Sequence, residues 1–357
     1  MNLRYPPAPP PPPSPTPPQI GNQLPQSELP NLSDVQKLLR FMMTSRRVEE
    51  RTVELYRQNR ITGGCYTGIG NEATSVGTAL ALNEDDVLVP THRDMGSHLV
   101  RGHKPLDIMR QYLKRATSQT GGKDSSLHLG KEGSNIVGMI SPLAHMMPVA
   151  VGIALAERQR GTPCSVLTTI GDGSTSLGDF HEALNFAAIQ KLPILFVIVN
   201  NQYAYSTPNT IQYACHELSE RANGYGMSGE TIDGTDAFVV YRAAQKALER
   251  GRNGEGPTLL ECKTMRLRGH SEHDDFKYVP PDLLEQWKNW DPVLRIRNYV
   301  LDNSILTEDD LETLKLEIDS EIESAISLAE SEPSPEGNEA GQDVFRHWKS
   351  EWTVPTP

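Results

Sequence analysis

A glycine–acid–glycine triplet and a pair of asparagines are the residues of this chain whose types and spacing point to chemistry. Asp172 stands between two glycines in GDGSTSLG, and Asn200 and Asn201 follow in VNNQYAYSTP. Carboxylate and amide oxygens are hard ligands that suit Mg²⁺ or Ca²⁺ rather than zinc. One carboxylate is too little to hold Mg²⁺ alone, so we expect the ion to share its ligands with phosphate oxygens of a bound molecule.

Gly173 favours the same interpretation. A glycine lets the backbone approach an anion closely, and free N–H groups point outward at the start of the helix that follows. The sequence has no GxxxxGK[ST] phosphate loop, and GDGSTSLG lacks the glycine order of a dinucleotide site. Asp-Gly and Asn-Asn are each common in ordinary turns, and a pair of such turns is the alternative interpretation.

Two strands and a helix must bring these residues together. Residues 165–170 (SVLTTI) and 193–199 (PILFVIV) are predicted as strands, and residues 179–190 between them as a helix. This order makes the two strands parallel, so that both end at the same edge of the sheet. Ligands bind at that edge in open α/β sheets. We therefore expect the side-chain oxygens of Asp172 and Asn201 to converge there.

Further segments extend this unit into an α/β fold with a mostly parallel sheet covered by helices on both faces. We predict helices over residues 35–58, 73–82, 145–160 and 241–250, strands over 87–90 and 257–265, and a long loop over 114–138. Ser33 and Asp34 are expected to cap the first helix. Thr307 and Asp310 predict a capping box for a last helix, whose many acids are interpreted as a solvated face.

The first 30 residues differ in composition from the rest, because twelve of them are proline. Such a segment favours polyproline II and cannot form a packed core. We predict a disordered tail over residues 1–30, with a docking arm for a partner as the alternative. Residues 31–357 are expected to form a single domain, with a C-terminal helical extension over about residues 305–332.

Composition excludes several classes of function for the 357-residue chain. Its net charge of −12 leaves no basic face for nucleic acid. The longest apolar stretch, Ile194 to Val199, is too short to span a membrane. The four cysteines lie far apart without a CxxC pair, which indicates reduced thiols. We therefore predict a cytoplasmic protein with neither a nucleic-acid nor a membrane partner.

An ordered set of motifs resembles the alpha subunit of the decarboxylating component of 2-oxo acid dehydrogenase complexes. The shared stretches, from about residue 60 to about residue 290, are HRDMG, ISPLA, GDGSTSLGDFHEALNFAA, NNQYAYSTP, GYGM with the nearby DG, GEGPTLLE and RGHS. GDG followed at a distance by NN resembles the family's thiamine diphosphate motif. The resemblance implies the three-layer α/β thiamine diphosphate-binding fold, with thiamine diphosphate and Mg²⁺ as cofactors. SPLA and STP resemble branched-chain members more than pyruvate members.

The resemblance also implies roles for single residues. Asp172, Asn201 and the backbone carbonyl of Tyr203 match the family's magnesium ligands. His270 matches a histidine near the diphosphate and the reacting centre, and we predict that it is catalytic. The residues expected to contact the cofactor are Arg93, Ser141, Leu143, Gly171, Gly173, Ser174, Asn201 and His270.

Three further positions have no assigned role. His92 and His145 lie in or beside the shared motifs, and Val199 stands where many family members have a polar residue before Asn-Asn. The valine removes one phosphate contact, so Arg93 and His270 are expected to contribute more of the binding. Arginine suits that role because its planar fork of donors matches a phosphate group.

The chemistry implied by the resemblance predicts partners. Loss of CO₂ from a 2-oxo acid leaves negative charge on the former carbonyl carbon, which requires an electron-sink cofactor. Thiamine enzymes need a carboxylate against the aminopyrimidine ring, and no candidate is evident in this chain. In the family that glutamate lies on a separate beta subunit. We expect two alpha and two beta chains to assemble, and the acyl group of the small 2-oxo acid substrate to pass to a lipoyl domain of the acyltransferase component.

Two alternatives stay open. A self-sufficient thiamine enzyme of the transketolase or decarboxylase kind needs a second α/β domain, which 357 residues are too few to hold. A non-catalytic subunit with the same fold is expected to lack Asp172, Asn201 or His270, and all three are present.

Overall fold

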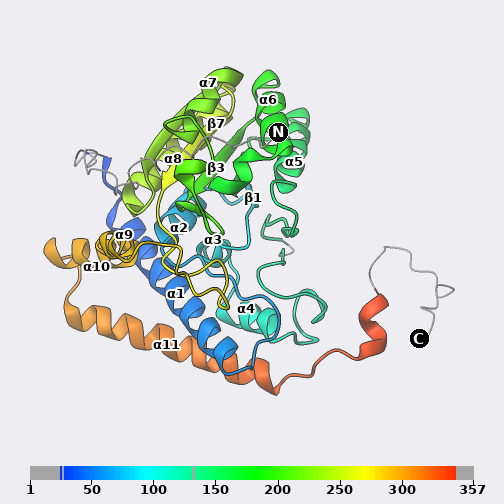
Figure 1. Cartoon of the computed structure of the whole chain (residues 1–357), viewed down its shortest axis with the longest axis vertical. Coiled ribbons are helices and arrows are strands. Elements are labelled where there is room, and N and C mark those ends of the chain that lie inside the picture. The colour runs from blue at the N-terminus through cyan, green and yellow to red at the C-terminus, as the bar shows by residue number, and fades with distance from the viewer. Residues whose placement is uncertain (1–24, 26–27, 131–132, 343–357) are drawn as a thin grey trace, which may run out of the picture.

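A parallel sheet of five strands lies at the centre of the computed structural model, which describes residues 25, 28–130 and 133–342 (Figure 1). In spatial order the strands are β1 (Val87–Val89), β2 (Val166–Gly171), β3 (Ile194–Asn200), β7 (Thr258–Lys263) and β6 (Ser228–Asp233). All four neighbouring pairs are parallel. Parallel neighbours need crossover connections, and helices supply them here. The predicted α/β class is confirmed.

The strands β2 and β3 are direct neighbours, in a register that pairs Gly171 with Val199. Asp172 follows the last residue of β2, and Asn200 ends β3, so both lie at the same edge of the sheet. A short 3₁₀ helix, η2 (Asp172–Ser176), leads into α6 (Gly178–Ile189), which returns the chain to β3. The predicted convergence of the two motifs follows from this unit.

Two helical layers cover the sheet, because successive side chains of a strand point to opposite faces. Leu195, Val197 and Val199 of β3 pack in a core with α1 (Leu32–Arg57), α2 (Glu72–Leu80), α8 (Ala237–Arg252) and α10 (Pro292–Asp302). Ile194, Phe196 and Ile198 pack on the other face with α5 (Met146–Arg160), α6 and α7 (Arg221–Tyr225). The result is the three-layer arrangement that was predicted.

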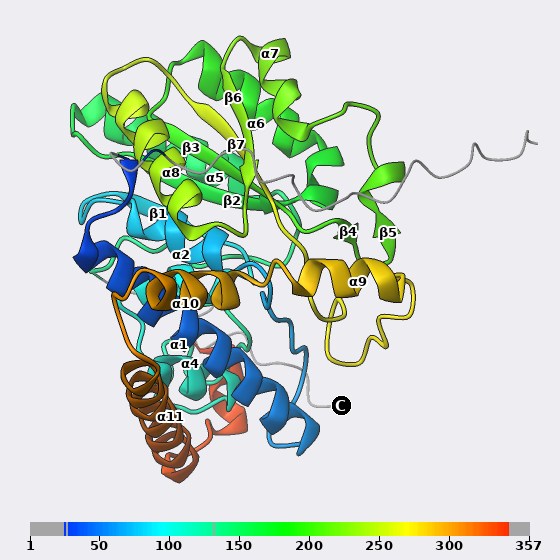
Figure 2. The same cartoon turned by 90° about the vertical axis from the view of Figure 1, so that its left-hand side faces the viewer.

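The last long helix, α11 (Glu308–Ser331), lies beside α1 and α4 (Pro105–Tyr112) (Figure 2). Its capping box between Thr307 and Asp310 is present. Several of its acids form ion pairs with arginines of α1, for example Asp319 with Arg47 at 2.7 Å and Glu323 with Arg51 at 2.5 Å. These acids therefore pair with the neighbouring helix as well as facing solvent, which the interpretation as a solvated face did not include.

The start of α1 differs from the prediction, and residues just before it contact the fold. Asn31, rather than Ser33 or Asp34, caps α1, since its side chain accepts a hydrogen bond from the Asp34 N–H at 3.0 Å. Arg242 donates to the carbonyls of Glu28 and Leu29, which lie within the predicted tail of residues 1–30. The rest of the proline-rich tail, residues 1–24 and 26–27, lies outside the described residues.

Other elements were not predicted from the sequence: β6, the helices α3 (Met95–Val100), α4, α7, α9 (Pro281–Lys288) and α10, and a small hairpin of β4 (Tyr203–Ala204) and β5 (Thr207–Pro208). No helix within residues 28–130 and 133–342 has the length and apolar composition needed to cross a membrane. The four cysteines are free thiols.

Candidate cofactor and cation site

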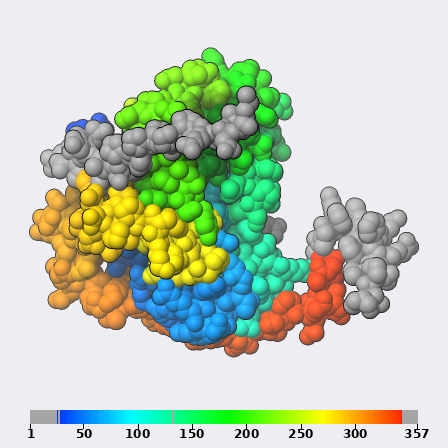
Figure 3. Space-filling view, in the orientation of Figure 1, coloured from blue at the N-terminus to red at the C-terminus, as the bar shows by residue number. Residues whose placement is uncertain are grey.

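A cavity of about 300 Å³ lies at the carboxyl edge of the sheet, beyond the ends of β2 and β3. The segment that contains His270, yellow in Figure 3, lies over α1 and the turn after it, blue in the same view. All of the predicted site residues line this cavity: Arg93, Ser141, Leu143, Gly171, Asp172, Gly173, Ser174, Asn201, Tyr203 and His270. Segments far apart in the sequence therefore meet where the motifs predicted a site.

One side of the cavity offers oxygen ligands to a cation. Asp172 is buried, and its carboxylate accepts a hydrogen bond from Gln212 Nε2 at 3.1 Å. Burial raises the pKa of Asp172 to about 6, against the opposing effect of hydrogen bonds from Gln212 and the backbone of Asn201. The buried Oδ1 of Asn201 has no hydrogen-bond partner in the described structure. A cation would satisfy this orphaned oxygen beside a desolvated carboxylate, so the residues fit Mg²⁺.

The small number of side-chain ligands at this site limits which metal ion it can bind. No group of three or more His, Cys, Asp or Glu side chains in the described ranges could hold a metal ion. An ion at Asp172 and Asn201 would therefore complete its shell with backbone carbonyls and with oxygens of a bound molecule. This need for shared ligands favours a magnesium–phosphate pair over a site built from protein side chains alone.

Gly173 has a packing reason in addition to the one predicted. A Cβ at this position would lie 2.3 Å from the Cβ of Ala204, which belongs to β4. The hairpin of β4 and β5 therefore packs directly on the GDG turn. This close approach places Tyr203, the residue before Ala204, at the cavity wall.

Two buried guanidinium groups occupy another side of the cavity. Arg93 donates to the carbonyls of Thr67 and His270, each at 2.7 Å, and Arg266 donates to the Tyr205 carbonyl at 3.0 Å. Neither arginine forms an ion pair with any described carboxylate, although both are buried. Burial and the nearby charge of Arg266 lower the pKa of Arg93 to about 10. The charge of Glu49 acts on Arg93, and those of Asp172 and Asp274 act on Arg266, but none forms a direct ion pair with them. Two desolvated cations side by side favour a polyanionic ligand.

The ring of His270 is held in one tautomer. Its Nδ1 lies 3.2 Å from the Arg93 guanidinium, which can only donate, so Nδ1 accepts and the proton is on Nε2. Burial, with the charges of Arg93 and Arg266, lowers the pKa of His270 to about 4. The rings of Tyr66 and Tyr205 flank it at centroid distances of 5.6 and 4.6 Å. His270 is therefore a neutral N–H donor at pH 7.

A family model described as dehydrogenase E1 component matches residues 40–338. The chain belongs to this family. The match covers most of the chain, including the sheet, the cavity and α11. It confirms the resemblance to alpha subunits of 2-oxo acid dehydrogenases, which are enzymes of the oxidoreductase class.

Similarity to individual proteins supports the same family assignment for this dehydrogenase E1 chain. It is 39% identical over 301 residues to the 2-oxoisovalerate dehydrogenase subunit alpha of Bacillus subtilis, covering 83% of this chain and 90% of the relative. It is 31% identical over 321 residues to the pyruvate dehydrogenase E1 component subunit alpha of Rickettsia felis, covering 90% and 98%. The alpha subunit of an acetoin:2,6-dichlorophenolindophenol oxidoreductase from Bacillus subtilis is 33% identical over 305 residues, covering 85% and 91%.

The structure places the three positions without an assigned role, His92, His145 and Val199, differently relative to the cavity of this dehydrogenase E1 chain. His92 and Val199 line the cavity. His145 is exposed outside the lining and lies 3.2 Å from the Asp179 carboxylate. Leu143 is 54% exposed, so it lies at the rim, where a partner chain could reach it.

Some lining residues were missed by the sequence reasoning. Among them are Asn71, Tyr205 and Arg266. Tyr205 lies two residues after Tyr203, Arg266 lies four residues before His270, and Asn71 follows a glycine-rich turn. The only signal for Arg266 in the sequence is its place in RLRGH, close to His270. The carboxylates among the cavity-lining residues are Asp94 and Asp172, and this lining includes no glutamate. Asp94 accepts hydrogen bonds from the Thr91 N–H and the Thr169 hydroxyl.

Proposed function

We propose that this chain is the alpha subunit of a thiamine diphosphate- and Mg²⁺-dependent enzyme that oxidatively decarboxylates a 2-oxo acid and transfers the acyl group to a lipoyl group. One observation supports this most strongly. A single cavity has one half suited to bind a cation and another suited to bind an anion. Asp172 and the orphaned Oδ1 of Asn201 form the first half, and the buried Arg93 and Arg266, which form no ion pair, form the second. A metal-bound diphosphate complements both halves at once.

Each half has a defined task in this proposal. Asp172, Asn201 and the carbonyl of Tyr203 hold Mg²⁺, while Arg93 and the backbone after β2 bind the diphosphate. When bound, the thiazolium ring of the cofactor supplies the electron sink that decarboxylation requires. Ser141 and Leu143 lie on the part of the wall available to the cofactor's rings. Met139, Met146 and Met147 make that wall apolar and help to exclude water.

His270 is the proposed catalytic residue. Its position beside Arg93 makes it a fixed donor, because the guanidinium holds Nδ1 as an acceptor and leaves the proton on Nε2. A neutral imidazole can hydrogen-bond the carboxylate or the 2-oxo oxygen of the substrate without a second cation in the site. The flanking rings of Tyr66 and Tyr205 limit its rotation.

A branched-chain 2-oxo acid is the favoured substrate. Support comes from SPLA and STP, and from the 39% identity to a 2-oxoisovalerate dehydrogenase alpha subunit. Apolar lining residues such as Met139, Ile140 and Val199 suit a branched aliphatic side chain. Pyruvate is the second candidate, supported by the similarity to pyruvate dehydrogenase alpha subunits at 30–33% identity.

The site is proposed to be completed by a beta subunit in an assembly of two alpha and two beta chains. The described residues that line the cavity include no glutamate to face the aminopyrimidine ring. Large apolar side chains at the rim and on the adjoining helices are exposed and suit a protein partner. They are Ile140, Leu143, Val149, Leu177, Phe186 and Ile189. A lipoyl domain of an acyltransferase is the proposed acceptor, and the cytoplasm the proposed location.

Co-expression with the beta chain tests this function. The purified assembly is assayed with 2-oxoisovalerate, pyruvate and acetoin, in the presence of thiamine diphosphate and Mg²⁺. We expect 2-oxoisovalerate to be decarboxylated faster than pyruvate, no cleavage of acetoin, which carries no carboxylate to lose, and loss of activity in Asp172→Ala. Activity of this chain without a beta subunit, or full activity of Asp172→Ala, would contradict the proposal.

A further inference from the structure

Asn71 has a buried amide whose hydrogen-bonding groups are unused. The side chain is 1% exposed and lines the cavity. Both its Nδ2 and its Oδ1 lack a hydrogen-bond partner among the residues that the structure describes. Asn71 is the N-cap residue of α2, where asparagine normally accepts from a backbone N–H of the first turn, but its side chain makes no capping bond. The amide is therefore available to a ligand.

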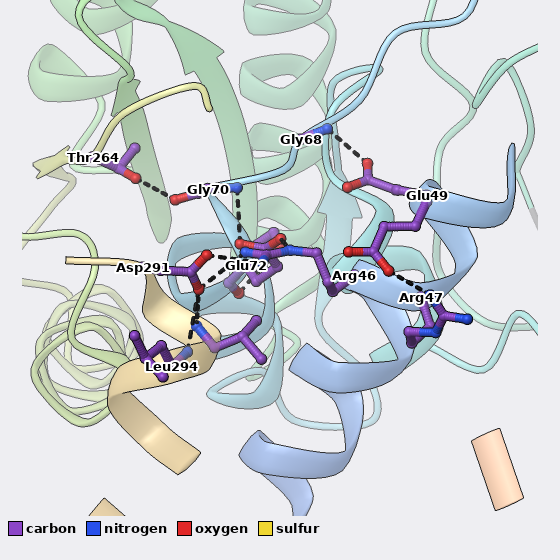
Figure 4. Close-up of polar contacts among 12 residues, drawn as sticks. Arg46, Arg47, Glu49, Gly68, Gly70, Glu72, Thr264, Asp291 and Leu294 are labelled. Atoms are coloured by element: carbon purple, nitrogen blue, oxygen red, sulfur yellow. Dashed lines mark hydrogen bonds and ion pairs between the residues drawn. The ribbon is translucent and has the colours of Figure 1, made fainter. Parts of the chain in front are cut away.

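A polar network fixes the turn that precedes α2 (Figure 4). Glu49 of α1 accepts a hydrogen bond from the Gly68 N–H at 2.7 Å, and Glu72 accepts one from the Gly70 N–H at 3.0 Å. Thr264 donates to the Gly70 carbonyl at 2.5 Å. These bonds come from three separate segments, so the orientation of Asn71 is determined by the surrounding fold rather than by its own side chain.

Glu72 is itself held in place. Arg46 of α1 donates to the Glu72 carboxylate at 2.5 Å and to Asp291 at 2.8 Å, which joins α1, α2 and the start of α10 (Figure 4). The Glu72 carboxylate is thus engaged by Gly70 and Arg46 rather than by the Asn71 amide. A buried amide left without partners destabilises a protein, so an arrangement that enforces one points to a function.

The same turn is joined to Arg93. The guanidinium of Arg93 donates to the Thr67 carbonyl at 2.7 Å. A Cβ on Gly68 would lie 2.1 Å from the Arg93 carbonyl oxygen, so the two backbones are in direct contact. Asn71 and Arg93 therefore belong to one wall of the cavity.

We propose that Asn71 is a ligand-binding residue of the cavity, whose amide Nδ2 donates a hydrogen bond to the diphosphate of the bound cofactor. The identity of the ligand rests on the proposed function. Oδ1 then accepts from a water molecule held between the ligand and the turn. Glu49 and Glu72 are positioning residues in this assignment, because they act on the ligand only through the turn.

Asn71→Leu separates a binding role from a structural one, because leucine has nearly the same shape and no polar atoms. Removing an unsatisfied buried amide is expected to raise the unfolding temperature of the ligand-free assembly by a few degrees. The same change is expected to weaken binding of thiamine diphosphate with Mg²⁺ by about tenfold. A residue that supports only the fold would give the opposite stability change and no selective loss of affinity.

Thr258→Val is the matched control. The Thr258 hydroxyl is also buried without a partner in the described structure, but it lies at the start of β7, away from the cavity lining. This variant is expected to gain stability while binding the cofactor as the wild type does. All measurements use the full chain assembled with its beta partner, by differential scanning calorimetry and isothermal titration calorimetry.

Titrations with inorganic diphosphate and Mg²⁺ test which part of the cofactor Asn71 contacts. Weaker binding of both diphosphate and thiamine diphosphate to Asn71→Leu supports the assignment. A loss confined to thiamine diphosphate overturns the diphosphate contact, and wild-type affinity for both ligands overturns a binding role. If the wild type binds diphosphate but not thiamine diphosphate, the proposed function fails while the diphosphate titration still tests Asn71.

Discussion

Gly173→Ala is expected to damage the site through one added methyl group. The new Cβ would lie 2.3 Å from the Cβ of Ala204 and 3.2 Å from its Cα. Carbon atoms in contact are normally about 3.5–4.0 Å apart, so Ala204 must move by roughly 1 Å. Ala204 pairs with Thr207 and Tyr203 with Pro208, so the hairpin moves as a unit.

The displacement has different consequences for stability and for activity. Overpacking of this kind costs about 1–3 kcal/mol of unfolding free energy, which a chain of this size tolerates. The Tyr203 carbonyl, proposed as a ligand of Mg²⁺, moves with Ala204. A misplacement of about 1 Å at a reacting site lowers activity by about 100-fold. We therefore expect a folded protein with little activity and weak cofactor binding.

A double variant and a control sharpen this test. Gly173→Ala combined with Ala204→Gly removes the Cβ–Cβ collision and is expected to recover at least part of the lost affinity for thiamine diphosphate. Gly178→Ala is the control in the same segment, since its Cβ would meet only Glu182 Oε1 at 3.9 Å. Calorimetric titration and steady-state kinetics measure both effects. Wild-type kinetics of Gly173→Ala, or no recovery in the double variant, would refute the packing explanation.

Three further variants address the cation, a buried histidine and a buried carboxylate. Mutation of a residue that only hydrogen-bonds to a metal ligand typically lowers metal affinity by about 10–100-fold. Asp172→Asn changes a proposed ligand itself, so it is expected to weaken Mg²⁺-dependent binding of thiamine diphosphate by more than this, as measured by titrations with and without Mg²⁺. Burial, with a smaller effect of His103, lowers the pKa of His98 to about 3, so the unfolded chain binds the proton first as pH falls. From pH 7 to pH 5 the wild type should lose about 2 kcal/mol more stability than His98→Leu in urea titrations. Glu261→Gln should cost about 1.5–3 kcal/mol and reduce Mg²⁺ affinity, because Glu261 accepts from Asn200 Nδ2 at 2.6 Å and from the Ser219 N–H at 3.0 Å.

Each of these variants has an outcome that would contradict its explanation. Equal affinity of Asp172→Asn with and without Mg²⁺, at the wild-type level, would remove the carboxylate from the cation site. Parallel stability curves for His98→Leu and wild type between pH 7 and pH 5 would mean that His98 is protonated in the folded state. Unchanged Mg²⁺ affinity in Glu261→Gln would mean that the Asn200 side chain does not orient Asn201.

Much of the site was predictable because its residues come at the ends of regular elements. The alternation of strand, helix and strand around Asp172 and Asn201 is strong enough to give the topology of β2 and β3, and the topology gives their convergence. The capping box at Thr307 was equally readable, because its two side chains are close in sequence. The role of a residue can thus be predicted from the sequence when it depends on residues close to it in the chain.

Features that depend on distant contacts were not predictable. Arg266 is an ordinary arginine in the sequence, and only its burial at the cavity wall without a direct ion pair makes it a site residue. Asn71 resembles an ordinary N-cap, and its free amide is evident only once Glu72 and Glu49 are seen to hold the turn. The strand β6 was missed because it is a polar edge strand, SGETID, with only Ile232 fully buried.

A crystal structure of the alpha–beta assembly with thiamine diphosphate and Mn²⁺ in place of Mg²⁺ tests the cation–diphosphate site most directly. Anomalous scattering locates the metal without reference to the protein chemistry. The proposal predicts a single strong peak within coordination distance of Asp172, Asn201 Oδ1 and the Tyr203 carbonyl, and of two diphosphate oxygens beside Arg93. A metal bound elsewhere, or a cofactor bound in the cavity without a metal at Asp172, would contradict it.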